Sequence, residues 1–273
     1  DIAIGLCPSI SGSKQQKGDV FLMNKDTSQY EACQLVTEEQ EKYYQFDKAF
    51  LDLMHEAIEI CPYFPYPYRE IAAPYVKSGH FIQWKKYIDK AVQYGQLDYL
   101  PVRASLRYKF FADYEGAIRD IDLLDSLVNY DIGYTSNGTY HLYVVKALCL
   151  KAIGDTQAAI RLIDKQLETP NYSASLFDYL HLGVLYMELG DYDRALSLFE
   201  AQEEVNELAD NFYYQALCHK AKGNQEAHQS NIKKAKAYYT EGLKMFDPYH
   251  ELFDQVYLSQ IDRELALISE KTD

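Results

Sequence analysis

A turn between two apolar helical stretches recurs along the chain, and its spacing is the feature that most constrains the fold. Successive turns lie 33, 42, 36 and 33 residues apart, at Gly79, Ala112, Gly154, Gly190 and Gly223. A period near this length is typical of proteins built from stacked helix–turn–helix units. One such unit cannot bury its apolar face alone, so the pattern predicts an array in which each helix pair packs against its neighbours.

The clearest copy of the unit covers residues 179–199, where each characteristic position has a physical role. Gly183 is small, which lets the second helix approach closely, and Phe199 is large enough to fill the space between the helices. Gly190 permits a positive φ where the first helix ends. Asp191 can then cap the second helix. The copy therefore specifies two helices packed closely around a short turn.

These positions together resemble the tetratricopeptide repeat. The residues that carry the resemblance are Tyr179, Leu182, Gly183, Tyr186, Gly190, Ala195 and Phe199. The resemblance implies an all-α protein without a sheet, built as a right-handed α-solenoid of antiparallel helix pairs over residues 65–245. The one long spacing of 42 residues is explained by an insertion at about residues 128–138, where Gly, Asn and Ser favour a longer loop.

The two ends of the chain lie outside the clear repeats. Residues 37–64 are predicted to form an N-terminal helix or a degenerate repeat, because Thr37-Glu-Glu-Gln40 matches a capping box. Residues 1–36 show no sustained period and are predicted to be irregular. Residues 246–273 are predicted to form a C-terminal capping helix, since Asp247-Pro248 is typical of a helix start and a terminal helix closes a solenoid.

Charge limits the kinds of partner. The formal net charge is −14, which disfavours nucleic acid because a chain this acidic repels phosphates at long range. Residues 219–245 depart from the trend with a net charge of +4, which fits either a docking surface for an acidic partner or a solvated helix face. No run of about 18 apolar residues is present, so no membrane span is predicted.

The cysteines and the first residue bear on localisation. Five cysteines are present without a CxxC motif, so free buried thiols are the expected state. This favours the cytoplasm. The chain does not begin with Met, so secretion or export to a periplasm after removal of a leader stays open.

No catalytic constellation emerges from the sequence, and we predict a protein that is not an enzyme and has no catalytic residue, metal or cofactor. Phosphate-binding loops, the nucleophile elbow and the HExxH zinc motif are absent. His55 and Glu59 share one helix face, but two ligands without a third do not make a metal site. Asp120 with Asp122, and Asp191 with Asp193, are better explained as helix-surface and capping carboxylates.

The resemblance places partner binding on the concave face, which is lined by the first helix of each pair. Residues at three- and four-residue steps in those helices form one stripe. The predicted groove residues are Tyr66, Arg69, Tyr99, Val102, Leu106, Lys109, His141, Val144, Leu148, Lys151, Phe177, Leu180, Val184, Met187, Tyr213, Leu217 and Lys220. Val102, Leu106, Val144 and Leu148 stand where some members of the family clamp the C-terminal carboxylate of a chaperone with Lys, Asn and Arg, so that partner is disfavoured.

The middle of this stripe is apolar, so something is expected to cover it. A peptide or helix of a partner protein could lie in the groove. Residues 1–36 or the terminal helix could fill it instead, or two copies of the chain could pair through it. Lys109 and Lys151 beside the stripe favour an acidic or C-terminal segment. An undetected helical-repeat enzyme is the remaining alternative.

Overall fold

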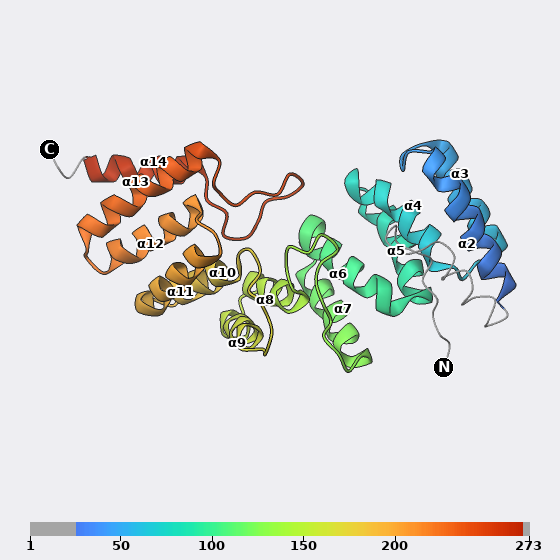
Figure 1. Cartoon of the computed structure of the whole chain (residues 1–273), viewed down its shortest axis with the longest axis horizontal. Helices are drawn as coiled ribbons and strands as arrows, with labels where there is room; N and C mark the ends of the chain where they lie inside the picture. The colour runs from blue at the N-terminus through green and yellow to red at the C-terminus, as the bar shows by residue number, and fades with distance from the viewer. Residues whose placement is uncertain (1–25, 270–273) are drawn as a thin grey trace. The chain divides into compact units, whose positions relative to one another are not determined.

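The computed structural model describes residues 26–269, and in this part of the chain the fold is all-α (Figure 1). Residues 26–269 contain thirteen α-helices and one short 3-10 helix, and their only β-type pairing is an isolated bridge between Tyr134 and His141. The all-α prediction is confirmed. The described residues divide into two compact units, with residues 26–112 and 122–131 in unit 1 and residues 113–121 and 132–269 in unit 2.

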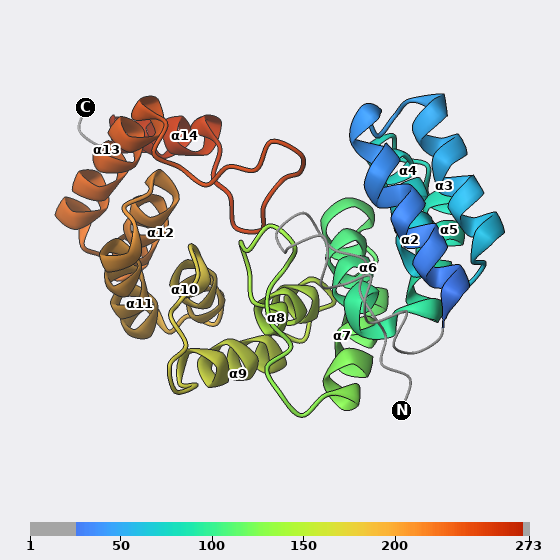
Figure 2. The same ribbon diagram turned by 45° about the vertical axis from the view of Figure 1, so that its right-hand side comes forward.

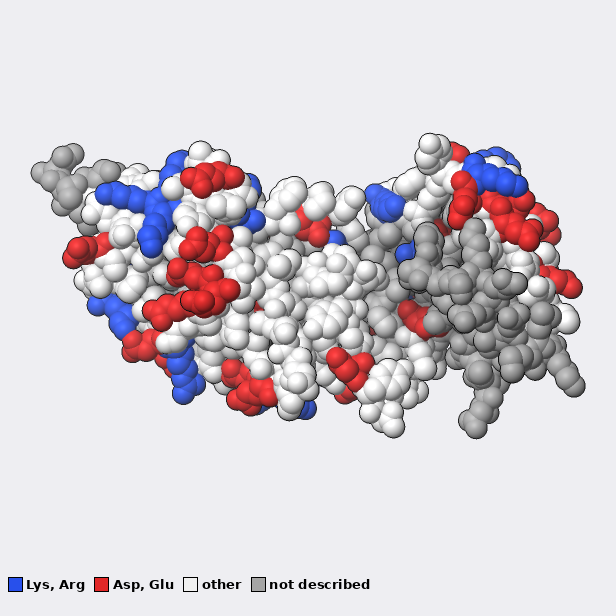
Figure 3. All heavy atoms as spheres, viewed as in Figure 1, with Lys and Arg blue, Asp and Glu red and all other residues white. Residues whose placement is uncertain are grey.

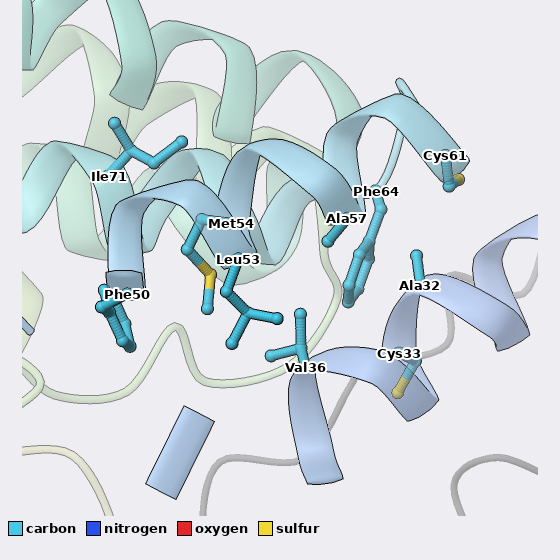
Figure 4. Packing of buried hydrophobic residues seen from close by; sticks show 10 residues of the cluster. All are labelled: Ala32, Cys33, Val36, Phe50, Leu53, Met54, Ala57, Cys61, Phe64 and Ile71. Carbon is cyan, nitrogen blue, oxygen red and sulfur yellow. The ribbon is translucent and has the colours of Figure 1, made fainter. Parts of the chain in front are cut away.

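Unit 1 consists mainly of consecutive helices joined by short turns. They are α2 (Thr27–Glu39), the 3-10 helix η1 (Gln40–Lys42), α3 (Lys48–Ile60), α4 (Pro65–Lys77), α5 (Phe81–Tyr94) and α6 (Gln96–Phe111). Helix α2 packs on α3 and α4 packs on α5. Figure 4 shows a core where α2, α3 and α4 meet, with Val36, Leu53 and Met54 side by side.

The N-terminal boundaries differ from the sequence-based prediction. Residues 27–36 are helical rather than irregular, because the carboxylate of Asp26 caps α2 by accepting from the Gln29 amide at 3.0 Å. Thr37 is not an N-cap: its hydroxyl donates to the Cys33 carbonyl at 2.7 Å inside the helix. Ser and Thr can bond the carbonyl four residues back as readily as they cap. Residues 1–25 of the segment predicted to be irregular lie outside the described residues.

The cysteines also depart from expectation at one position. Cys61, Cys149 and Cys218 are buried free thiols, as predicted. Cys33 is disulfide-bonded, so the expectation of a free thiol is wrong there.

Unit 2 contains most of the regular repeats. Its helices are α8 (Leu142–Ala152), α9 (Thr156–Leu167), α10 (Asp178–Glu188), α11 (Tyr192–Val205), α12 (Ala209–Ala221), α13 (Gln225–Glu241) and α14 (Leu258–Ser269). The first part of α7 (Tyr114–Leu127), up to Ile121, also belongs to this unit. Helices α8 and α9, α10 and α11, and α12 and α13 form the three pairs, and α9 packs on α10 as α11 packs on α12.

The local roles assigned to the clearest copy hold in the structure. A Cβ added to Gly183 would lie 2.5 Å from Cε1 of Phe199, so the two helices do meet closely at this position. Gly190 has a φ of 81°, and the Asp191 carboxylate accepts from the Arg194 amide at 3.3 Å to cap α11. The predicted insertion is the connection between α7 and α8.

The C-terminal helix starts later than predicted. Residues 242–257 are not helical, and α14 begins at Leu258 rather than near Pro248. The reason lies in α12, where the buried Asp210 carboxylate accepts the backbone amides of Met245 at 2.8 Å and Val256 at 2.6 Å. These two bonds hold together the ends of a loop, residues 245–256, which we call the C-terminal loop.

Candidate protein-binding site

The C-terminal loop extends from the α13–α14 end of unit 2 to the first helices of the repeats (Figures 1 and 2). The loop carries a buried carboxylate, that of Asp254, whose side chain is 6% exposed. One oxygen accepts from Nζ of Lys151 on α8 at 2.6 Å, and the other lies 2.7 Å from Nδ1 of His181 on α10. One acidic side chain therefore joins two successive helix pairs.

The protonation pattern follows from the partners. A carboxylate only accepts, so Nδ1 of His181 donates to Asp254, and Nε2 of the same ring lies 3.1 Å from the Tyr140 hydroxyl. Burial by itself would raise the pKa of the Asp254 carboxyl, but the His181 hydrogen bond and the Lys151 charge outweigh it and lower that pKa. Burial would lower the pKa of Lys151, yet Asp254 and Glu188 raise it. The pair is therefore ionised.

Aromatic side chains from two further helices complete the site. The Tyr214 hydroxyl on α12 donates to the backbone carbonyl of Asp254 at 3.1 Å. The Phe253 ring meets the Tyr114 ring of α7 edge-on, with centroids 5.8 Å apart. Leu252 is 4% exposed, so residues 252–254 form the inserted stretch of the loop. We call the groups that hold it, namely Tyr114, Lys151, His181 and Tyr214, the loop-binding site.

The predicted groove residues of unit 2 are mostly inaccessible in this conformation. Val144, Leu148 and Leu180 are fully buried and Val184 is 2% exposed. His141, Phe177 and Tyr213 are buried as well. The two groove lysines of this unit form ion pairs with acidic residues near the C-terminus. Lys151 pairs with Asp254, and Lys220 pairs with Glu264 of α14 at 2.6 Å. Partner contact by these residues stays a prediction.

In unit 1, the connection between α2 and α3 lies against the predicted groove residues of α4. The Tyr66 hydroxyl donates to Gln40 at 2.7 Å, and Arg69 pairs with the buried Glu70, which accepts from Gln45 at 3.0 Å. Tyr99 is buried, whereas Val102, Leu106 and Lys109 of α6 are half-buried.

Sequence reasoning missed His181, Tyr214 and Asp254. His181 and Tyr214 each follow a predicted groove residue directly, so the stripe that meets the loop is rotated by one residue on α10 and α12. A polar His between Leu180 and Leu182, in the apolar middle of α10, was the available signal. Asp254 was placed in a helix, and its contacts with Lys151 and His181, 103 and 73 positions earlier, leave no trace in a periodic pattern.

The basic stretch at residues 219–245 lies on α12, α13 and the start of the loop, and Figure 3 shows basic side chains, Lys or Arg in blue, among acidic ones at this end of unit 2. Several of these lysines have partners within the chain. Lys236 pairs with Asp262 at 2.6 Å, Lys234 lies over the Phe212 ring and Lys244 over the Tyr239 ring. These contacts favour a solvated helix face over a free docking surface.

The arrangement around His181 gives no support for catalysis. An acid, a histidine and a hydroxyl lie in line, but His181 is fully buried and Tyr140 is 3% exposed. Burial raises the pKa of Tyr140 well above its ordinary value, which disfavours the phenolate that a nucleophile or base would need. Within residues 26–269, no group of three or more His, Cys, Asp or Glu is placed to hold a metal ion. No helix of this part is long and apolar enough to span a membrane.

Comparisons with known proteins place the fold. A sequence model of the tetratricopeptide repeat matches residues 179–207, and no curated protein matches the chain. Among solved structures, PilF of Pseudomonas aeruginosa has a TM-score of 0.58 at 13% identity, covering 80% of this chain and 94% of PilF. BtubC of P. vanneervenii has a TM-score of 0.56 at 15% identity, covering 89% and 99%.

A third structure, YrrB, is described as a TPR protein with an unusual peptide-binding site. It has a TM-score of 0.52 at 17% identity, covering 69% of this chain and 93% of YrrB. At these identities the likeness concerns the fold alone. Residues 179–207 thus match a tetratricopeptide repeat, and the turns of the neighbouring helix pairs, at Gly154 and Gly223, have the same positive φ as Gly190.

Proposed function

We propose that this chain is a non-enzymatic scaffold for protein–protein interaction, which binds a peptide or helix of a partner along the first helices of its repeats. One observation carries the proposal. The helices α8, α10 and α12, each the first of its pair, jointly hold a single non-helical stretch of chain through Lys151, His181 and Tyr214. A face that holds one such segment of chain has the geometry to hold another.

The repeat fold supports this proposal, and so does the peptide-binding site named for YrrB. The groove lysines suggest a partner segment that carries carboxylates, since Lys151 and Lys220 already bind such groups from the same chain. A net charge of −14 argues against nucleic acid as the partner. The experiment below also detects any pairing of two copies through this face.

Site-specific photo-crosslinking tests the proposal. A photoreactive phenylalanine analogue replaces Met187, a half-buried residue on α10, and in the control it replaces Arg161, which is exposed on α9. We expect ultraviolet light to link partner proteins to the Met187 variant and not to the Arg161 variant. Equal adducts at both positions, or none at either, would contradict binding along the first helices. An adduct of twice the chain's mass would identify a second copy.

A further inference from the structure

We propose that the C-terminal loop is an intramolecular ligand, and that the loop-binding site accepts a partner segment of the same chemistry when the loop leaves. That segment is non-helical and carries an aliphatic residue, an aromatic residue and a carboxylate in succession, as Leu252, Phe253 and Asp254 do. This inference rests on the proposed function and specifies its ligand and its control.

The site is built for an anion. The side chains of Lys151 and His181 are 13% and 0% exposed, and both point at the same carboxylate. A buried cation without a partner is strongly unfavourable, so an empty site would favour any segment that brings a carboxylate. Lys151 also pairs with the half-exposed Glu188 at 2.9 Å. Because Glu188 remains when the loop leaves, Lys151 keeps one partner during the exchange.

The loop is attached in a way that allows its middle to leave. Its ends are held separately, by the bonds from the Met245 and Val256 amides to Asp210. Between these ends, Phe246 and Tyr249 are 66% and 73% exposed, so part of the loop already faces solvent. Compact loops with fixed, adjacent ends are frequently functional elements of protein surfaces.

The loop also binds at a conformational cost. Asp254 has a φ of 61°, in the left-handed region that residues other than Gly adopt less readily. A partner that presents its carboxylate from ordinary extended backbone does not bear this cost. Such a partner can therefore compete with the loop although the loop is tethered beside the site.

The test supplies the loop sequence in trans. A variant carries a Gly-Ser stretch of equal length in place of residues 247–255, so that both amides bound by Asp210 are kept. The probe is a fluorescein-labelled peptide of residues 247–257, followed by anisotropy. We expect saturable binding to the loop-replaced variant and binding at least about tenfold weaker to the intact protein. A peptide carrying Asp254→Asn should also bind at least about tenfold more weakly, because a buried charge pair is lost.

The matched control is a peptide carrying Glu251→Gln, since Glu251 is exposed in the loop and its change removes the same charge. This peptide should bind like the parent peptide. Absence of saturable binding to a loop-replaced variant that keeps its helical circular dichroism would overturn the inference. Equal binding of the Asp254→Asn peptide would do so as well. In either case, partner proteins crosslinked to the Met187 variant would still support the proposed function. Failure of the inference is therefore distinguishable from failure of the proposed function.

If the loop-replaced variant does not fold, the intact chain serves instead. Asp254→Asn should bind the labelled peptide at least about tenfold more tightly than Glu251→Gln does, because only the first change frees the site. Equal affinities would show that the loop is a fixed structural element and would overturn the inference.

Discussion

The turn between paired helices shows what a single residue decides. At four of the five recurring turns the residue is Gly with positive φ, and at the fifth it is Ala112 with a φ of 50°. An L residue in this region is disfavoured by about 1 kcal/mol or more, because its Cβ crowds the backbone. The turn at Ala112 therefore adopts a left-handed backbone like the Gly turns, although alanine disfavours this conformation.

We expect Ala112→Gly to raise the free energy of unfolding by about 1 kcal/mol, as the change removes the Cβ from a left-handed position. Gly190→Ala should lower it by a similar amount, about 1 kcal/mol, because an added Cβ meets no atom within 4 Å and only backbone strain results. Urea denaturation of the two variants measures both values. Changes of the same sign would contradict this account of the turn.

Gly183 constrains packing rather than backbone conformation. Gly183→Leu should lower the free energy of unfolding by about 1–3 kcal/mol, because the side chain would overlap the Phe199 ring and force α10 and α11 apart. Ala152→Leu is the control, since Ala152 is exposed near the end of α8 and the same side chain should change stability by less than about 0.5 kcal/mol there. Thermal unfolding followed by circular dichroism distinguishes the two outcomes.

At the scale of an element, the C-terminal loop is defined by contacts with helices far away in sequence. Asp210 holds its two ends, and Lys151 with His181 holds Asp254. Burial raises the pKa of Asp210, although the amides of Met245 and Val256 oppose this. Buried carboxylates therefore order the loop together with a backbone bond of its own, from the Gln255 amide to the Leu252 carbonyl at 3.3 Å.

Asp210→Asn should lower the free energy of unfolding by about 2–3 kcal/mol, because an amide keeps one acceptor oxygen and leaves one buried backbone N–H unpaired. Asp193→Asn offers a comparison, since the Asp193 side chain is 85% exposed and its pairing with Lys222 contributes at most about 1 kcal/mol. Urea denaturation provides the measurement. Similar effects for the two variants would argue against the role assigned to Asp210.

The lowered pKa of Asp254 predicts that its contribution to the free energy of unfolding is lost at acid pH. A carboxyl whose pKa is lower in the folded than in the unfolded chain stabilises the fold above the unfolded value of about 3.9. That stabilisation is lost as pH falls through the lower folded value. The difference in unfolding free energy between the intact protein and Asp254→Asn should therefore shrink as the pH falls below about 4. A constant difference down to pH 3 would contradict the ion pair.

At the scale of the whole molecule, net charge and repeat architecture determine which partners are suitable. With a net charge of −14, the protein should pass through a DNA–cellulose column at about 0.15 M salt, where screening leaves only short-range attraction. Retention that is released by higher salt would show that the lysines near α13 act as a nucleic-acid surface (Figure 3).

What the sequence determined by itself is the repeating unit. Gly190, Asp191 and the contact of Gly183 with Phe199 act within one helix pair, so their spacing is sufficient to predict the all-α array and the position of each turn. Tertiary structure decided where the pattern is broken. Thr37 could cap a helix or bond back within one, and only the Asp26 cap eleven residues earlier settles which.

The candidate site was decided by the tertiary structure. Lys151 was identified by its place in a helical stripe, but its partner Asp254 lies 103 residues later, in a segment whose sequence favours a helix start. Local preference there is outweighed by the buried Asp210, which draws Met245 and Val256 together and excludes a helix between them. Contacts of this range depend on how the stacked pairs bring distant residues together, and no periodic pattern in the sequence records them.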